Sequence, residues 1–283
     1  MDWSTRLQEP KYWLLGIAAA IAALHLALID RAGNSELFAT SALFWITAGS
    51  LFWDRRHSLI LESGWASSLL GTGLLAAFFL RSASLPGSDT FLKISPFFAI
   101  LGLCCLASGV KSLKQYWQEL TVFGLLALNP LLENLLQLLD LSTLTAKAAT
   151  FILWYLGFQI QRQGIFLHLP TGSVQVYEMC SGLQSIVQMI NVAVLFLLMF
   201  PLKSLAQKIT CIVVAIIIGF VVNAARVCLM ANLVAQKTSF EYWHTGNGSL
   251  IFSMISVALF GGFCWLAFLR TPQKPLDGAE ANG

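Results

Sequence analysis

Three residues able to perform acyl transfer stand at the edges of the last apolar runs of the chain. They are Cys180 in the stretch EMCSGLQS, Arg226 in VVNAARVCLM and His244 in YWHTGNGS. A cysteine thiolate is a nucleophile, and an imidazole can take the thiol proton and return one to a leaving amine. A guanidinium near the reacting carbonyl can stabilise an oxyanion. The three residues therefore predict covalent catalysis through a cysteine, provided that the fold brings them together.

Helix geometry predicts on which side of a membrane each of these residues lies. From Cys180 to Pro201 is about 21 residues, or about 31 Å of helix. The next run returns over about 18 residues, or about 27 Å, from Lys208 to Arg226. His244 precedes the last apolar run, which is again long enough to cross a bilayer core of about 30 Å. We therefore expect Cys180, Arg226 and His244 on one face.

The neighbours of these residues suggest supporting roles. A cysteine at a helix N-terminus feels the positive end of the helix dipole, so we expect Cys180 to be accessible and its pKa to be low. Gly182 is expected to leave room for a substrate backbone. Asn223 lies on the same helical face as Arg226 and is expected to orient it. Ser181 completes the predicted supporting set.

Each of the three residues also has a purely structural explanation. A lone cysteine can be a packing residue, and an arginine at a helix end can extend its charge to the lipid headgroups. A histidine beside Tyr242 and Trp243 can belong to an interfacial aromatic belt. Among the other histidines, His168 is the rival base, His25 lies within a span, and His57 lies in a loop beside two arginines.

The composition indicates a membrane protein. The 283 residues are 57% hydrophobic and only 11% charged, with a mean hydropathy of +0.73. A soluble domain carries about 25% charged residues. The net charge of +3 is spread along the chain, so no nucleic-acid partner is indicated. No cysteine or histidine spacing predicts a metal site, and no cofactor is expected. Five cysteines are interpreted as small core residues: Cys104, Cys105, Cys211, Cys228 and Cys264.

The apolar runs predict an all-α polytopic membrane protein with about eight transmembrane helices in one membrane domain, residues 1–283. A span needs roughly 20 apolar residues. The ambiguous segment 144–158 is short and contains Lys147, so we interpret it as an amphipathic helix in the interface, although it could span. Alternation at 164–178 predicts a small extracytoplasmic β-hairpin. The predicted spans are 13–29, 37–53, 65–80, 92–110, 119–139, 182–200, 209–231 and 248–269.

These elements divide the domain into four parts. Five spans occupy 1–140, the interfacial helix and hairpin occupy 141–180, a catalytic three-helix part occupies 181–270, and a disordered tail occupies 271–283. With a cytoplasmic N-terminus and an interfacial 144–158, ten of the 17 Lys and Arg residues face the cytoplasm. This modest bias has the sign that the positive-inside rule expects and places Cys180 outside.

At EMCSGLQS (178–185), VVNAARVCLM (221–230) and YWHTGNGS (242–249) the chain resembles the exosortase/archaeosortase family of membrane cysteine transpeptidases, in particular its cyanobacterial branch. The likeness covers roughly residues 145–269, and its elements occur in the family's order. The resemblance implies that Cys180 is the nucleophile and His244 the proton-transfer group, with Arg226 stabilising the oxyanion or the substrate.

The resemblance also implies a substrate class and a location. The substrates would be secreted proteins that end in a Pro-Glu-Pro motif, a transmembrane helix and a basic tail, a signal of the PEP-CTERM type. The enzyme would cleave this sorting signal through a thioester on Cys180. It would lie in the lipid bilayer of the bacterial plasma membrane, with its active site at the extracytoplasmic face.

Two other functional classes remain open at this point. A transporter or lipid-handling protein would fit Pro96 and Pro130, because prolines within apolar runs can mark broken helices. No inverted repeat accompanies them, however, and charged residues within the spans are few. In a non-catalytic assembly protein, Cys180 would only be a packing residue.

Overall fold

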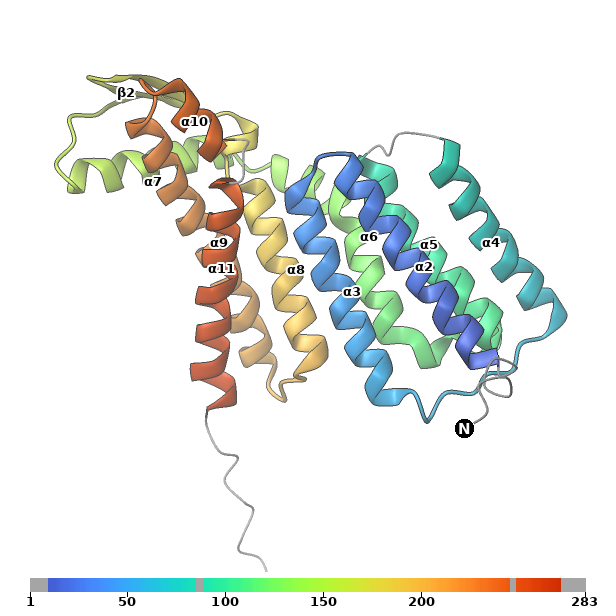
Figure 1. Cartoon of the computed structure of the whole chain (residues 1–283). Coiled ribbons are helices and arrows are strands. Elements are labelled where there is room, and N and C mark those ends of the chain that lie inside the picture. Colours follow the sequence, from blue (N-terminus) through green and yellow to red (C-terminus); the bar gives the residue numbers. More distant parts are fainter. Residues whose placement is uncertain (1–9, 85–88, 245–247, 271–283) are drawn as a thin grey trace, which may run out of the picture.

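The computed structural model describes residues 10–84, 89–244 and 248–270, which form a helical bundle with one small sheet (Figure 1). Apolar runs fold as helices because a helix satisfies its own backbone polar groups in lipid. The first half contains α2 (Pro10–Arg31), α3 (Ser35–Arg55), α4 (Trp65–Ser84), α5 (Asp89–Ser108) and α6 (Trp117–Gln137). The chain continues through α7 (Leu141–Tyr155), β1 (Gln161–Gln163), β2 (Phe166–Leu169), β3 (Gly172–Gln175), α8 (Leu183–Met199), α9 (Leu205–Asn232), α10 (Lys237–His244) and α11 (Gly248–Cys264).

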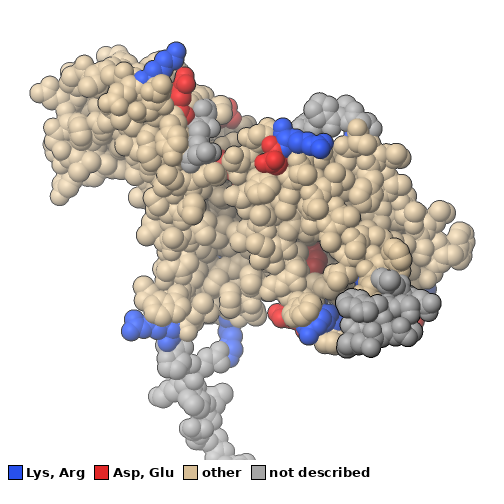
Figure 2. Space-filling model, in the orientation of Figure 1, with Lys and Arg blue, Asp and Glu red and all other residues tan. Residues whose placement is uncertain are grey.

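The predicted class, a polytopic all-α membrane protein, is confirmed, and a helix lies at each of the eight predicted positions. By length and composition, six segments of the described part of the chain can cross a membrane; α3 is not among them, and α8 has only 17 residues. Figure 2 shows the charged side chains gathered toward the two ends of the bundle, with an almost uncharged band between them. The six segments are Lys11–Arg31, Trp65–Ala83, Asp89–Ser108, Val110–Gln137, Leu205–Asn232 and Gly248–Leu269.

The N-terminal helices pack around an apolar core that includes one histidine. His25 is fully buried, and its Nε2 lies 2.8 Å from the carbonyl oxygen of Leu92. The indole of Trp45 donates to its Nδ1 at 3.1 Å. Both ring nitrogens are thus used between helices, which makes His25 a structural residue. Pro96 and Pro130 lie inside α5 and α6, and neither of them breaks its helix.

Helix α7 runs crosswise to α9 and α11 and lies beside the small sheet at one end of the bundle (Figure 1). This orientation agrees with the interfacial interpretation, in which α6 ends and α8 begins at the same face. The sheet has three antiparallel strands in the order β1-β2-β3, so the prediction of a simple hairpin is incomplete. The predicted strands pair across the turn that contains Pro170, and β1 adds to the free edge of β2.

The C-terminal helices position the three predicted active-site residues. Buried side chains of α8, α9 and α11 form one cluster, and residues of α7, the sheet and α9 form another that contains Cys180. All five cysteines that were interpreted as core residues are buried. The division of the chain into functional parts stays a prediction, and the predicted tail at 271–283 lies outside the described residues.

Candidate active site

The turn that carries Cys180 is held by its own backbone and by α9. The Cys180 N–H donates to the Tyr177 carbonyl at 2.9 Å and closes a 3₁₀ turn. Gly182 follows with φ of 86°, a left-handed conformation that glycine adopts at little cost, and α8 begins at Leu183. From α9, Nδ2 of Asn223 donates to the Cys180 carbonyl at 3.0 Å. Cys180 is therefore fixed just before α8, outside its first turn.

The structure gives two supporting residues contacts that the sequence did not predict. A Cβ at Gly182 would lie 2.8 Å from Nδ2 of Asn223, so this glycine accommodates the asparagine and leaves no room for a substrate backbone. The bond that Asn223 donates goes to Cys180 instead of orienting Arg226. Both differences have one cause, since the asparagine fills the space beside the glycine and reaches the Cys180 turn that precedes α8.

Ser181 ties the turn to α7. Its hydroxyl donates to the Glu178 carbonyl at 2.6 Å, and its own carbonyl accepts a bond of 2.7 Å from Oγ1 of Thr145. Ser181 and Thr145 are both buried, so these bonds give partners to polar groups that have little contact with solvent. The predicted supporting residue thus anchors the Cys180 turn to the crosswise helix.

Arg226 binds the end of α10 that carries His244. Its Nε donates to the Trp243 carbonyl at 3.1 Å, and its Nη2 donates to the His244 carbonyl at 2.5 Å. The last carbonyls of a helix lack partners within the helix and carry partial negative charge, so a cation is favourable there. Arg226 therefore fixes the backbone of His244 while part of its five N–H groups stays outside these two bonds.

The side chain of His244 meets a residue that the sequence interpretation missed. Its Nε2 lies 3.0 Å from the hydroxyl of Tyr177, and the two rings pack edge to face with centroids 5.9 Å apart. Tyr177 also holds the Cys180 N–H through its carbonyl. Its place three residues before Cys180 was the only signal in the sequence.

The exposure and the pKa of Cys180 differ from the prediction of an accessible thiol with a low pKa. Cys180 is only 3% exposed. Burial raises the pKa of its thiol, and the Arg226 guanidinium offsets part of that effect. Burial, and then the charge of Arg226, lower the pKa of His244. Both shifts favour the uncharged forms: at Cys180 burial outweighs the charge of Arg226, and at His244 burial and that charge act in the same direction.

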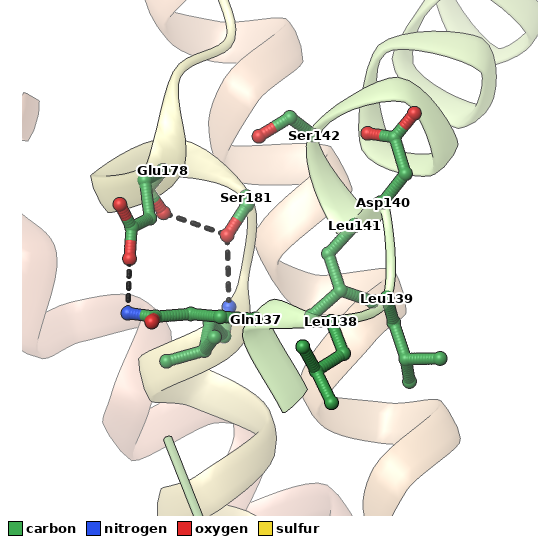
Figure 3. A pocket seen from close by; sticks show the side chains of 9 residues that line it. Gln137, Leu138, Leu139, Asp140, Leu141, Ser142, Glu178 and Ser181 are labelled. Carbon is green, nitrogen blue, oxygen red and sulfur yellow. Dashed lines mark hydrogen bonds between the residues drawn. The ribbon is translucent and has the colours of Figure 1, made fainter. Parts of the chain in front are cut away.

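A cavity of about 360 Å³ borders the Cys180 turn, between α6, α7 and α8 (Figure 3). Glu178 and Ser181 form one wall, and Gln137 at the end of α6 donates through Nε2 to the Glu178 carboxylate. Cys180 does not line this cavity, and its side chain belongs to the buried cluster on the α9 side. The cavity therefore borders the backbone of the Cys180 turn, whereas the Cys180 thiol is covered by the buried cluster.

The rival base His168 has a structural contact of its own. Its Nδ1 lies 2.7 Å from Oγ of Ser173, its register partner on the neighbouring strand β3. Within the described ranges, no group of three or more His, Cys, Asp or Glu side chains could hold a metal ion.

Comparison with known families decides what kind of protein carries this site. The family model for transmembrane exosortase (EpsH) matches residues 30–261, which is most of the chain and includes all three predicted catalytic residues. The chain belongs to the transmembrane exosortase family. No curated protein and no solved structure matches it. Membership in this family supports a multi-pass membrane protein of the protein-processing class.

Proposed function

We propose that this exosortase is a cysteine protease or transpeptidase that cleaves the C-terminal sorting signal of secreted proteins through a thioester on Cys180. The observation that carries the proposal is the direct bond between Arg226 and the backbone of His244, at the end of the bundle where Asn223 of α9 holds the Cys180 turn. A packing cysteine and two unrelated boundary residues would have no reason to converge in this way.

The proposed reaction begins with proton transfer from the Cys180 thiol to His244. The sulfur attacks the scissile carbonyl, and N–H groups of Arg226 that are outside the α10 bonds stabilise the oxyanion. When the intermediate collapses, the C–N bond breaks and His244 gives its proton to the leaving amine. A second nucleophile then attacks the thioester, gives up its proton through His244, and releases Cys180 as a thiol.

Substrate entry requires a movement of α10 in this proposal. Phe240 and Trp243 of α10 pack against the buried cluster that contains Cys180. The substrates would be secreted proteins with a Pro-Glu-Pro motif, a transmembrane helix and a basic tail. That helix would enter the bilayer beside the bundle, and the motif would reach Cys180 from the extracytoplasmic face of the bacterial plasma membrane.

Trapping of the acyl-enzyme tests the proposal. The full chain is co-expressed with a protein that ends in such a tripartite tail, and the membranes are examined for a covalent adduct. We expect an adduct on Cys180 that neutral hydroxylamine releases. Processing that continues in Cys180→Ala, or an adduct that persists in this variant, would reject cysteine catalysis by this site.

The base assignment predicts opposite outcomes for two histidines. His244→Ala should reduce processing by about 100-fold or more, because general base catalysis contributes about 100- to 10,000-fold. His168→Ala should retain most of the activity, since its ring bonds Ser173 within the sheet. Burial lowers the pKa of His244 from its ordinary value of 6.5, so the acidic limb of the pH–rate profile should be shifted to lower pH than for an ordinary histidine. An essential His168 would reverse the assignment.

Tyr177 should act as a positioning residue for His244. Tyr177→Phe removes the hydroxyl 3.0 Å from Nε2 but keeps the ring contact, so we expect processing to fall about tenfold with unchanged thermal stability. Tyr155→Phe is the matched control, because Tyr155 is exposed on α7. Equal rates for the two variants would remove Tyr177 from the mechanism.

A further inference from the structure

Strand β3 leaves one edge of the small sheet unpaired, and this strand leads directly to the Cys180 turn. The sheet has the order β1-β2-β3, so among the described residues no strand pairs with the outer side of β3. The sheet and α10 lie together at one end of the bundle (Figure 1). Only Val176 separates β3 from Tyr177, whose hydroxyl meets His244. The free edge therefore ends beside the candidate active site.

The hydrogen-bond pattern shows which backbone groups face this edge. The Val176 N–H donates to the Ile165 carbonyl at 2.9 Å, and bonded and non-bonded pairs alternate along an antiparallel ladder. The N–H and C=O groups of Ser173 and Gln175 therefore point away from β2. Both residues are exposed, and within the described part of the chain these four groups have no hydrogen-bond partner. The edge thus offers two donors and two acceptors along one strand.

The two free edges of the sheet differ in their side chains. On β1 the backbone groups that face outward belong to Arg162, because Gln161 and Gln163 are in bonded pairs with β2. A charged side chain on an edge strand is one of the devices that prevent pairing with another chain, as are prolines and bulges. Strand β3, Gly172–Gln175, contains no charged residue and no proline. The β3 edge is therefore the edge that is suited to receive a further strand.

We propose that the free edge of β3 binds the extended segment of the substrate next to the scissile bond, as an added strand. This inference rests on the proposed function and adds the place where the substrate docks. An extended peptide can join an exposed sheet edge through main-chain hydrogen bonds. The added strand would lie about 4.8 Å from β3, and at about 3.3 Å per residue it passes from the level of Gln175 to that of Tyr177 within about two residues.

The direction of the two chains favours a parallel arrangement. Strand β3 leads through Cys180 into α8, and the substrate would lead through its scissile bond into its own transmembrane helix. Both chains then run from the sheet toward the bilayer. The proposed Pro-Glu-Pro signal is compatible with this docking, because only every second residue of a paired segment directs its N–H to the neighbouring strand. Prolines two residues apart can both turn their ring nitrogens away from β3.

Disulfide trapping tests the docking independently of catalysis. The protein carries Cys180→Ser and Gln175→Cys, and single cysteines are placed at successive positions before the transmembrane helix of a co-expressed tail-bearing substrate. Membranes are oxidised with copper phenanthroline, and adducts are separated on non-reducing gels. We expect adducts at every second substrate position near the scissile bond, because side chains along a strand alternate between two faces. Gln161→Cys on the opposite strand β1 is the control and should not give this pattern.

A proline at the edge tests the backbone contribution. Gln175→Pro removes an N–H that faces the free edge but keeps the bonds to β2, so its melting temperature should stay near that of the wild type. We expect processing to fall about tenfold, because one hydrogen bond is lost and the proline ring stands where the added strand approaches. Gln175→Ala keeps the N–H, and Arg162→Pro makes the same change on the other edge. Both controls should process substrate at a near-normal rate.

Three results would overturn the docking, even if the wild type processes the substrate. They are the absence of adducts at every position, adducts that do not alternate, and a normal rate in Gln175→Pro. An adduct between two copies of the Gln175→Cys protein, in place of one with the substrate, would also overturn it. Alternating adducts with a substrate that the wild type does not process would support the docking and reject the proposed catalysis. The two failures are thus distinguishable.

Discussion

Cys180→Ser should reduce substrate processing by at least about 1000-fold while the protein still inserts and accumulates. A serine hydroxyl is a much weaker nucleophile than a thiol unless a base and an oxyanion site are both arranged for it. Burial already raises the pKa of the Cys180 thiol, so the resting site does little to ionise an even weaker acid. Conversion of a tail-bearing substrate, followed by gel shift in membranes, measures the loss.

The chain offers a matched control for this change. Cys228 belongs to the same buried cluster, and its thiol donates to the Ala149 carbonyl at 3.5 Å. Cys228→Ser keeps a donor at that place, so it should process substrate at a near-normal rate. Equal loss in both variants would mean that the cluster responds to polarity and that Cys180 has only a packing role.

Arg226→Lys should lower processing by about 100-fold or more, although the charge is conserved. The guanidinium donates through Nε and Nη2 to two successive carbonyls of α10, and the proposed mechanism uses its remaining N–H groups on the oxyanion. An ammonium group does not reproduce this planar array, and loss of one oxyanion donor typically costs about 100- to 1000-fold. The rate and the insertion level are measured together.

Two further variants separate catalysis from anchoring at the membrane surface. Arg162→Lys on β1 is the control. This arginine is exposed, and its side chain donates a hydrogen bond to the Gly164 carbonyl, away from the site. It should leave processing near normal. Arg226→Ala should regain part of its activity when guanidinium is added. Near-normal processing by Arg226→Lys would mean that Arg226 has only a structural role, in which its charge caps a helix or reaches the lipid headgroups.

Much of the fold could be predicted because it depends on local pattern. The length of each apolar run compared with the bilayer thickness placed a helix at every predicted position. The rise per residue placed Cys180, Arg226 and His244 at the same end. The alternation after α7 predicted two strands, whereas β1, with only three residues, was too short to give such a pattern.

Details of the site could not be predicted because they depend on how side chains from different helices share space. Neither the composition nor the spacing indicated that Asn223 would occupy the space beside Gly182. The burial of the Cys180 thiol could not be predicted for the same reason, because it comes from residues of α7, α9 and α10 that pack together.

The sequence by itself determined a polytopic helical membrane protein, and it predicted that the three candidate catalytic residues lie at one end of the helices. These properties follow from the hydrophobicity of short segments and from the fixed rise per residue of a helix, and both depend only on residues that are close in the sequence. The tertiary structure decided that Tyr177 meets His244 across 67 residues, that Asn223 holds Cys180 across 43, and that Arg226 binds the end of α10. Those contacts depend on the packing of whole helices, because packing sets which side chains come within bonding distance.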